Sequence, residues 1–351
     1  MIHRTANFDL IRLAAAFMVL WSHQFALTGL PASGLPWVGD YGALGVYIFF
    51  AISGYLNAQS LIRSQSALTF LTSRAFRIFP ALIVCVAFCV VLGATVTSRD
   101  WAGYALPDSG GLLGRNGPVS FFWRNSTLLF GLDYHLPGVF ENNAYPRAVN
   151  GSLWTLPHEV KLYLVLAVIG LCVRFRSSPL AGLMLAGLVG LLVFGLVRPL
   201  GPLLEGKHLA IFAIIFTAGA GLAMVEQRFG LAVALAGFAA LAAAFALSGN
   251  ALVAVLLAVT VACVLLNQVP LPRWTAPKYD ISYGVYLYAF PVQQLLSNWP
   301  AGFWLRLAAV VVIVSALGLI SAAFVEQPAL RWRRSIGQGR LAVRPAEQPA
   351  G

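Results

Sequence analysis

Long apolar stretches recur along the whole chain, separated by short polar or basic segments. Each stretch of about 18–22 residues is long enough, as a helix, to cross the ~30 Å hydrocarbon core of a bilayer. We place about ten of them, at residues 8–30, 41–62, 78–97, 152–173, 180–197, 209–224, 231–247, 251–269, 281–297 and 303–324. The pattern predicts an all-α polytopic membrane helical bundle with about ten transmembrane helices. It divides the chain into a transmembrane domain at 1–330 and a basic tail at 331–351.

The composition excludes most other classes of protein. Apolar residues make up 59% of the chain and charged residues 10%, whereas a soluble domain has about 25% charged residues. Disordered, coiled-coil and disulfide-scaffold proteins are excluded by the same values. The four cysteines lie inside apolar stretches without a zinc spacing, so we expect buried free thiols and no metal. The first stretch carries Asp9, Arg12 and His23 and no cleavage site follows it, which indicates a permanent span rather than a signal peptide.

The net charge of +11 indicates topology rather than nucleic-acid binding, because the basic residues lie between apolar stretches and not in one patch. Most of them fall on one side of the membrane if the N-terminus is cytoplasmic. We therefore expect a multi-pass cell (inner) membrane protein with both termini in the cytoplasm. The loop at 98–150 is then extracytoplasmic, and its apolar part at 119–132 is too short to span, which favours a re-entrant or interfacial helix. The tail is expected to be frayed.

Ionisable residues inside the first span are the first candidates for function. Arg12 and His23 are eleven residues apart, which is ~20° past three helical turns, so both share one face ~16 Å apart along the axis. Asp9 lies on the same face and can pair with Arg12. A charged group in hydrocarbon costs ~2.5–3.5 kcal/mol and is by default a functional candidate. The alternative is that Asp9 and Arg12 are interfacial anchors and His23 is a core histidine.

Glu159 is the carboxylate we expect beside His23. It lies about eight residues, or ~12 Å, below the outer face, and His23 lies about seven residues below it. A carboxylate at that depth would orient the imidazole and stabilise its charged form, as a general base requires. The alternative is a structural ion pair with Lys161 or an arginine. His158 and Lys161 are interpreted as pocket wall or snorkelling residues.

Two further segments place polar groups at the entry or in the middle of a predicted span. Arg74 and Arg77 are spaced i,i+3 at the cytoplasmic entry of a helix, and paired guanidinium groups suit phosphate, although ordinary positive-inside anchoring is the alternative. Ser53 and Gly54 are two adjacent small residues in mid-membrane, where close helix packing or the approach of a ligand to the backbone is possible. Glu326, near the end of the last span, is interpreted as an interfacial cap or an ion-pair partner.

Taken together, these segments resemble the membrane-bound acyltransferase-3 family, which O-acylates carbohydrates. The matching pieces run in family order from residue 8 to residue 328: FDLIRLAAAFMVLWSH, FFAISGYL, SRAFRIFP, SLWTLPHEVKLYL, ISYGVYLYAFPVQ and FVEQP. One departure is Ala289, where many members have a histidine, so the role in substrate handling that the resemblance implies for that histidine is absent here.

The resemblance implies a donor, an acceptor and a set of roles. The donor would be a cytoplasmic acyl-CoA, usually acetyl-CoA, and the acceptor a hydroxyl of a polysaccharide, lipid-linked glycan or glycolipid. Arg12, Arg74 and Arg77 would bind the donor phosphates, and His23 would deprotonate the acceptor or relay the acyl group. Glu159 or Asp9 would set the charge of the imidazole. The pocket would include Ser53, Trp154, Tyr163 and Tyr286.

Two other functions are compatible with the sequence. Polar groups in mid-membrane also line the path of an exporter or transporter of a glycan or small solute, although we find no internal repeat of the kind transporters carry. A scaffold in an envelope-assembly complex would explain the hydrophobicity but not the buried histidine. The expected partners are membrane lipid, the acyl-CoA and the carbohydrate, without nucleic acid, and a homo-oligomer is one of the open oligomeric states.

Overall fold

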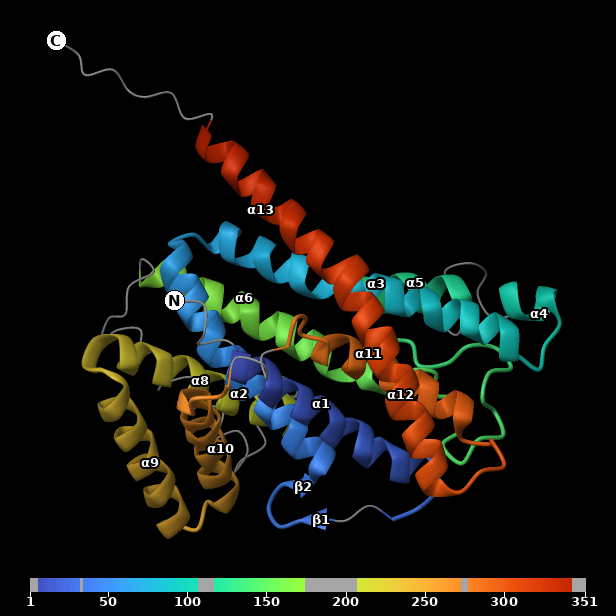
Figure 1. Ribbon diagram of the computed structural model, residues 1–351, viewed down its shortest axis with the longest axis horizontal. Helices are drawn as coiled ribbons and strands as arrows, with labels where there is room; N and C mark the ends of the chain where they lie inside the picture. Colours follow the sequence, from blue (N-terminus) through green and yellow to red (C-terminus); the bar gives the residue numbers. More distant parts are fainter. Residues whose placement is uncertain (1–5, 32–33, 107–116, 174–206, 273–276, 343–351) are drawn as a thin grey trace.

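The computed structural model describes residues 6–31, 34–106, 117–173, 207–272 and 277–342 (Figure 1). The helices are α1 (Ala6–Leu27), α2 (Tyr41–Ser64), α3 (Ala67–Val96), α4 (Trp101–Ala105), α5 (Pro118–Thr127), α6 (Leu156–Cys172), α8 (Lys207–Phe229), α9 (Leu231–Leu247), α10 (Ala251–Gln268), α11 (Ser282–Leu296), α12 (Phe303–Ser321) and α13 (Gln327–Ala342). A 3-10 turn, η2 (Gly151–Thr155), precedes α6, and a π-helical turn, η5 (Ala322–Glu326), joins α12 to α13. Strands β1 (Gly34–Leu35) and β2 (Gly39–Asp40) form an antiparallel hairpin.

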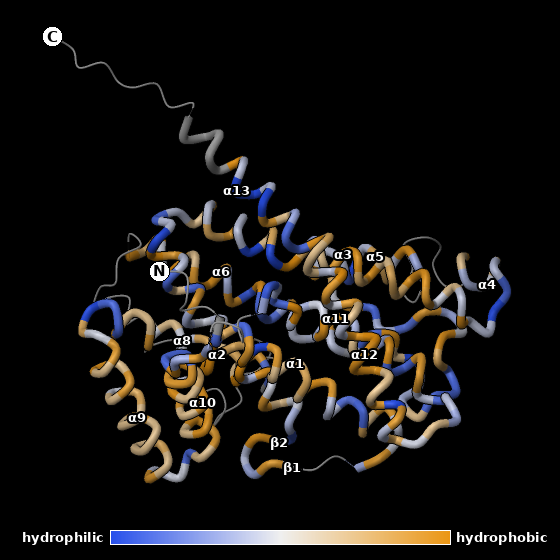
Figure 2. The backbone as a smooth tube through the Cα atoms, in the orientation of Figure 1, coloured by the Kyte–Doolittle hydropathy of each residue, from blue (hydrophilic) through white to orange (hydrophobic). Residues whose placement is uncertain are grey.

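The predicted membrane bundle is confirmed as a class. By length and composition, seven helices of the described chain can cross a bilayer: Asn7–Leu27, Tyr41–Ser64, Ala67–Val96, Gly151–Cys172, His208–Phe229, Ala251–Gln268 and Phe303–Ile336. The stretches predicted at 231–247 and 281–297 form the shorter helices α9 and α11. The tenth, at 180–197, lies outside the described residues. Figure 2 shows the apolar colour running along most of these helices, with polar residues gathered at their ends.

Helix α2 is the centre of the bundle and packs against α1 on one side and α8 on the other. Small residues make the second contact close: a Cβ added at Gly54 would lie 1.9 Å from the carbonyl oxygen of Phe216 in α8. In the same way, a Cβ added at Gly219 of α8 would lie 2.3 Å from the carbonyl oxygen of Ala51 in α2. Helix backbones in membranes approach closely where such residues meet. Gly54 is therefore a site of close helix packing.

The long loop is only partly at the surface. Helix α5 packs along α3 (Figure 1), so the short helix predicted at 119–132 is present, although it ends at Thr127. Beyond it the chain enters the bundle, because the amide of Asn143 donates to the carbonyl of Gln294 at 2.9 Å and the amide of Asn150 donates to the carbonyl of Leu287 at 2.9 Å. Both carbonyls belong to α11. The turn η2 consequently begins inside the protein, beside Phe290.

The C-terminal segment differs from the expected frayed tail. After the π-helical turn η5 the chain continues as helix α13 to Ala342, and Figure 1 shows this helix leaving the bundle. The ring of Trp332 lies 5.4 Å from that of Phe76 in α3, and Arg333 donates to the carbonyl of Thr69 at 3.3 Å. These contacts attach the first turns of α13 to α3, so fraying does not begin at Arg331.

Candidate active site

Two pockets meet inside the bundle. The first, which we name the arginine pocket, has a volume of about 100 Å³ and is lined by polar residues that include Arg12, Ser53, Asn57, Arg74, Arg77, Glu159 and Tyr163. The second, the histidine pocket, has a volume of about 570 Å³ and is lined by residues that include Ser22, His23, Asp40, Tyr47, Trp154, His208 and Phe212. Val46 and Tyr286 line both pockets. The two spaces therefore adjoin at these side chains.

Helix α1 carries one candidate residue into each pocket. Arg12 lines the arginine pocket and His23 lines the histidine pocket, as expected from their shared helical face. The His23 ring packs edge-on against Phe290 of α11, with centroids 5.2 Å apart and an interplanar angle of 80°. Its Nδ1 atom is buried and has no hydrogen-bond partner among the described residues. Packing against Phe290 thus holds the His23 ring while its Nδ1 stays unpaired. Buried polar atoms without a partner are rare in native proteins and require a specific explanation.

The carboxylate that lines the histidine pocket is Asp40, which the sequence analysis missed. It caps the N-terminus of α2: Oδ1 accepts the N–H of Ala43 at 2.7 Å, and Oδ2 accepts the hydroxyl of Ser22 at 2.7 Å. An aspartate directly before an apolar helical stretch is a recognised capping signal, so the sequence did indicate the cap. Its approach to the first span depends on the β1–β2 hairpin, whose strands are too short to predict from periodicity.

Glu159 lies in the arginine pocket instead. It accepts hydrogen bonds from the hydroxyl of Ser53 at 3.1 Å and from the hydroxyl of Tyr163. The amide of Asn57 donates to Ser53 Oγ at 2.9 Å, which completes a polar cluster between α2 and α6. The alternative interpretation, an ion pair of Glu159 with Lys161, is not found among the described residues, and Lys161 is exposed.

The expectation that Glu159 and His23 share a depth is not met. On α2, Gly42 lies against Ser22 beside His23, whereas Tyr55 lies against Phe8, one turn from Arg12. Ser53, and with it Glu159, is therefore level with the Arg12 end of α1. The physical reason is the buried loop before η2: the chain is already deep in the bundle when α6 begins, so counting residues from the outer face misplaces Glu159.

The three arginines differ in their partners. Arg77 forms ion pairs with Asp280 at 2.5 Å and with Glu326 at 3.2 Å, so Glu326 is an ion-pair partner, one of the two roles expected for it. Arg12 lies 3.4 Å from Asp9, as its spacing predicted, and 3.7 Å from Asp280. Burial alone would raise the pKa of Asp280, but the charges of Arg77 and Arg12 hold it below its usual value. Asp280 was missed because it lies in a loop.

Arg74 has no carboxylate partner within 4.0 Å in the part of the chain that the structure describes. Its guanidinium donates to the hydroxyl of Ser60 at 3.4 Å and to that of Ser73 at 3.3 Å, and it lies 5.8 Å from the centroid of the Phe70 ring. Arg77 is neutralised by two acids, whereas the charge of Arg74 remains available to a ligand of the arginine pocket.

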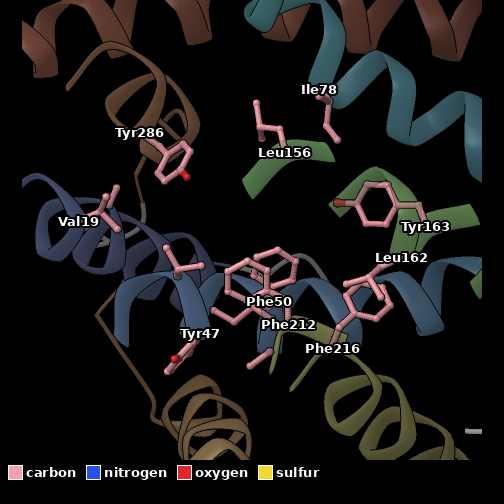
Figure 3. Close-up of a cluster of buried hydrophobic side chains, with 14 of the residues drawn as sticks. Val19, Tyr47, Phe50, Ile78, Leu156, Leu162, Tyr163, Phe212, Phe216 and Tyr286 are labelled. Carbon is pink, nitrogen blue, oxygen red and sulfur yellow. The ribbon is translucent and has the colours of Figure 1, made fainter. Parts of the chain in front are cut away.

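Aromatic residues line the boundary and the wall of the site. The Tyr286 hydroxyl donates to the carbonyl of Ser152 at 2.7 Å and lies 2.6 Å from Thr155 Oγ1. Figure 3 shows Tyr286 and Tyr163 entering the apolar cluster from opposite sides, with their hydroxyls directed toward its middle. Trp154 lines the histidine pocket, where its ring meets that of His208 at 4.8 Å and 76°.

Comparison with known proteins identifies the family. Residues 5–325 match the family model described as an acyltransferase domain. The chain belongs to this acyltransferase family. It is 30% identical over 344 residues to the O-acetyl transferase of Shigella phage Sf6, which covers 93% of this chain and 96% of that protein. It is 32% identical over 378 residues to Nodulation protein 10 of Rhizobium leguminosarum bv. viciae, covering 97% of each chain. No solved structure matches.

This membership decides between the functional classes left open by the sequence. The protein is an acyltransferase, and its seven apolar helices make it a multi-pass membrane protein. As an enzyme of group transfer it requires an acyl donor and an acceptor.

Proposed function

We propose that this membrane O-acyltransferase moves an acetyl group from cytoplasmic acetyl-CoA to a hydroxyl of a carbohydrate, with His23 as the general base. The observation that carries the proposal is the meeting of the two pockets at Val46 and Tyr286, with cations on one side and an unpaired imidazole on the other. The name of the phage relative supports acetyl as the group, and the family resemblance supports acyl-CoA and a carbohydrate.

The donor binds in the arginine pocket. Guanidinium groups are the side chains best suited to phosphate. Arg74 has no carboxylate partner within 4.0 Å among the described residues, whereas Arg12 pairs with Asp9 at 3.4 Å and lies 3.7 Å from Asp280. Arg77 acts through its carboxylate partners, which tie α3 to η5 and to the start of α11. The thioester arm then follows α1 toward His23, ~16 Å away along the helix.

The acceptor binds in the histidine pocket, against the Trp154 and His208 rings. His23 takes the proton of the sugar hydroxyl as its oxygen attacks the thioester carbonyl. The C–S bond then breaks, the thiolate of CoA leaves, and the proton passes from the imidazolium to that sulfur. Glu159 stays with Ser53 and Tyr163 on the donor side, where it orients these hydroxyls, and Asp9 stays with Arg12.

The test uses purified protein in lipid nanodiscs with radiolabelled acetyl-CoA and a panel of methyl pyranosides as acceptor probes. We expect His23→Ala to lower acetyl transfer about 10²- to 10⁴-fold, the usual contribution of a general base. The control is His135→Ala, because His135 is exposed and lies outside both pockets. Transfer at a near wild-type rate by His23→Ala would overturn the base assignment. Calorimetry with acetyl-CoA tests the donor half separately and does not require an acceptor.

A further inference from the structure

We propose that Asp40 is the positioning residue whose charge compensates the His23 imidazolium during acyl transfer. The family resemblance had implied Glu159 or Asp9 for this role. The inference rests on the proposed function, since it concerns the base of that reaction. It assigns a catalytic contribution to a residue that otherwise reads as the cap of a helix.

Proximity within one pocket is the first argument. Asp40 and His23 line the histidine pocket together, and the other titratable side chains lining it are Tyr47, His208 and Tyr286. The Asp40 carboxylate accepts a hydrogen bond from Ser22, the residue next to His23 in α1. Glu159 lines the other pocket. Asp40 is thus the carboxylate available to balance a positive charge on the imidazole.

The fixed position of the Asp40 carboxylate is the second argument. Each oxygen accepts a hydrogen bond of 2.7 Å, one from the Ala43 N–H and the other from Ser22, the residue before His23. Gly42 leaves the room that the bond with Ser22 needs, because a Cβ at Gly42 would lie 3.2 Å from Asp40 Oδ1 and 2.8 Å from Ser22 Cβ. A charge held by two donors needs no reorganisation when the opposite charge develops nearby, which is how preorganised sites stabilise transition states.

The unpaired state of His23 is the third argument. Its Nδ1 has no hydrogen-bond partner in the described chain, so no direct carboxylate bond stabilises the ring in the manner of a catalytic triad. When the acceptor hydroxyl gives its proton to His23, the new C–O bond forms and the C–S bond of the thioester breaks. The imidazolium exists until its proton reaches the thiolate, and the Asp40 charge stabilises it throughout that interval.

The test removes the charge while keeping the helix cap. Asp40→Asn and Asp40→Ser both retain a capping side chain. Diethyl pyrocarbonate modifies neutral imidazole, and peptide mass spectrometry resolves His23 from the other histidines. We expect the midpoint pH of His23 modification to fall by on the order of one pH unit in both variants, because the protonated ring loses its counter-charge. We also expect kcat at pH 8 to fall about tenfold, with the KM for acetyl-CoA unchanged.

Glu141→Gln is the matched control, since it removes a carboxylate that is exposed and lies outside both pockets, and its midpoint should remain that of the parent. A midpoint that is unchanged in both Asp40 variants, in protein with the parent melting temperature, would overturn the inference. The modification experiment needs no turnover. It therefore fails independently of the proposed function, which is tested by the activity of His23→Ala.

Discussion

Gly54 offers the most direct test of how the two pockets are held together. In Gly54→Ala the new methyl carbon would lie 1.9 Å from the carbonyl oxygen of Phe216, 2.8 Å from its carbonyl carbon and 3.0 Å from its Cα. All three atoms belong to the backbone of α8, so no side-chain rotation relieves the overlap. Ordinary contact begins near 3.4 Å, and 3.4 minus 1.9 gives 1.5 Å. The helices α2 and α8 must separate locally by that distance.

This separation affects stability and activity together. Overpacking of a well-filled interior costs about 1–3 kcal/mol, and the better helix propensity of alanine offsets up to ~1 kcal/mol. We expect a melting temperature lower by about 3 °C. Helix α2 carries Ser53 to the arginine pocket, and α8 carries His208 and Phe212 to the histidine pocket. Since a 1 Å misplacement can cost about 100-fold in rate, acetyl transfer should fall at least about tenfold.

The cysteines supply the assay. Cys85, Cys89 and Cys263 are buried and report unfolding to a thiol-reactive dye, whereas Cys172 is exposed and should be replaced by serine in the parent protein. The control is Gly237→Ala in α9, where an added Cβ meets no atom within 4 Å. Its melting temperature should equal or exceed that of the parent, because alanine is the better helix former.

Two results would refute this reasoning. If Gly54→Ala has the melting temperature of the parent and retains full activity, the close contact between α2 and α8 does not constrain the pockets. If Gly54→Ala and Gly237→Ala lose the same stability, the loss arises from the helices themselves and not from their packing.

Three further predictions concern the charged and aromatic residues. Asp280→Asn leaves Arg77 with one acid and should lower the free energy of unfolding by about 3 kcal/mol. The pKa of Asp280 is held below its usual value. The stabilisation by Asp280 should therefore persist from pH 8 to pH 5 and be lost only as the pH falls through that lowered pKa. Arg74→Ala should raise the KM for acetyl-CoA about tenfold, since an uncompensated cation is lost from the donor pocket. Trp154→Ala should raise the KM for the carbohydrate about tenfold with the acetyl-CoA KM unchanged, because an aromatic wall is lost from the acceptor pocket.

Each of these has a measurement that can contradict it. Dye-monitored melting of Asp280→Asn across pH 5–8 contradicts the ion-pair argument if the difference from the parent disappears at neutral pH. The exposed Arg63 is the matched control for Arg74, and equal effects of the two alanine variants on the donor KM would indicate a general charge effect. Trp101, which is 74% exposed, is the control for Trp154. A change in donor KM for Trp154→Ala would place this residue on the wrong side of the site.

The sequence predicts the helices and their inward faces well, because both depend on local periodicity. The spacing of Arg12 and His23 was enough to place both on an interior face, and Asp9 was correctly paired with Arg12. Helix geometry is nearly constant, so angular arguments of this kind transfer directly from sequence to structure. Each predicted apolar stretch in the described chain overlaps a helix, although α3 begins at Ala67, well before the stretch predicted at 78–97.

The level of one helix against another could not be predicted in the same way. Glu159 was misplaced because its depth depends on where the buried loop delivers the chain to η2, and that is fixed by Asn143 and Asn150 binding carbonyls on α11. The partners of Arg77 come from 203 and 249 residues away. Such long-range ion pairs leave no local signal, so Arg77 looked equivalent to Arg74.

The part of the long loop between Asp133 and Asn150 has the polar composition of a surface segment but the hydrogen bonding of an interior one. Surface loops usually tolerate insertions and drift in sequence. Here the side-chain amide of Gln294 donates to the carbonyls of both Tyr145 and Ala148. A residue added to this part of the loop, or deleted from it, would move these two carbonyls away from the buried amide. Epitope tags and topology reporters inserted between Asp133 and Asn150 should prevent the helical bundle from folding. Differences in length among related chains should occur outside this segment.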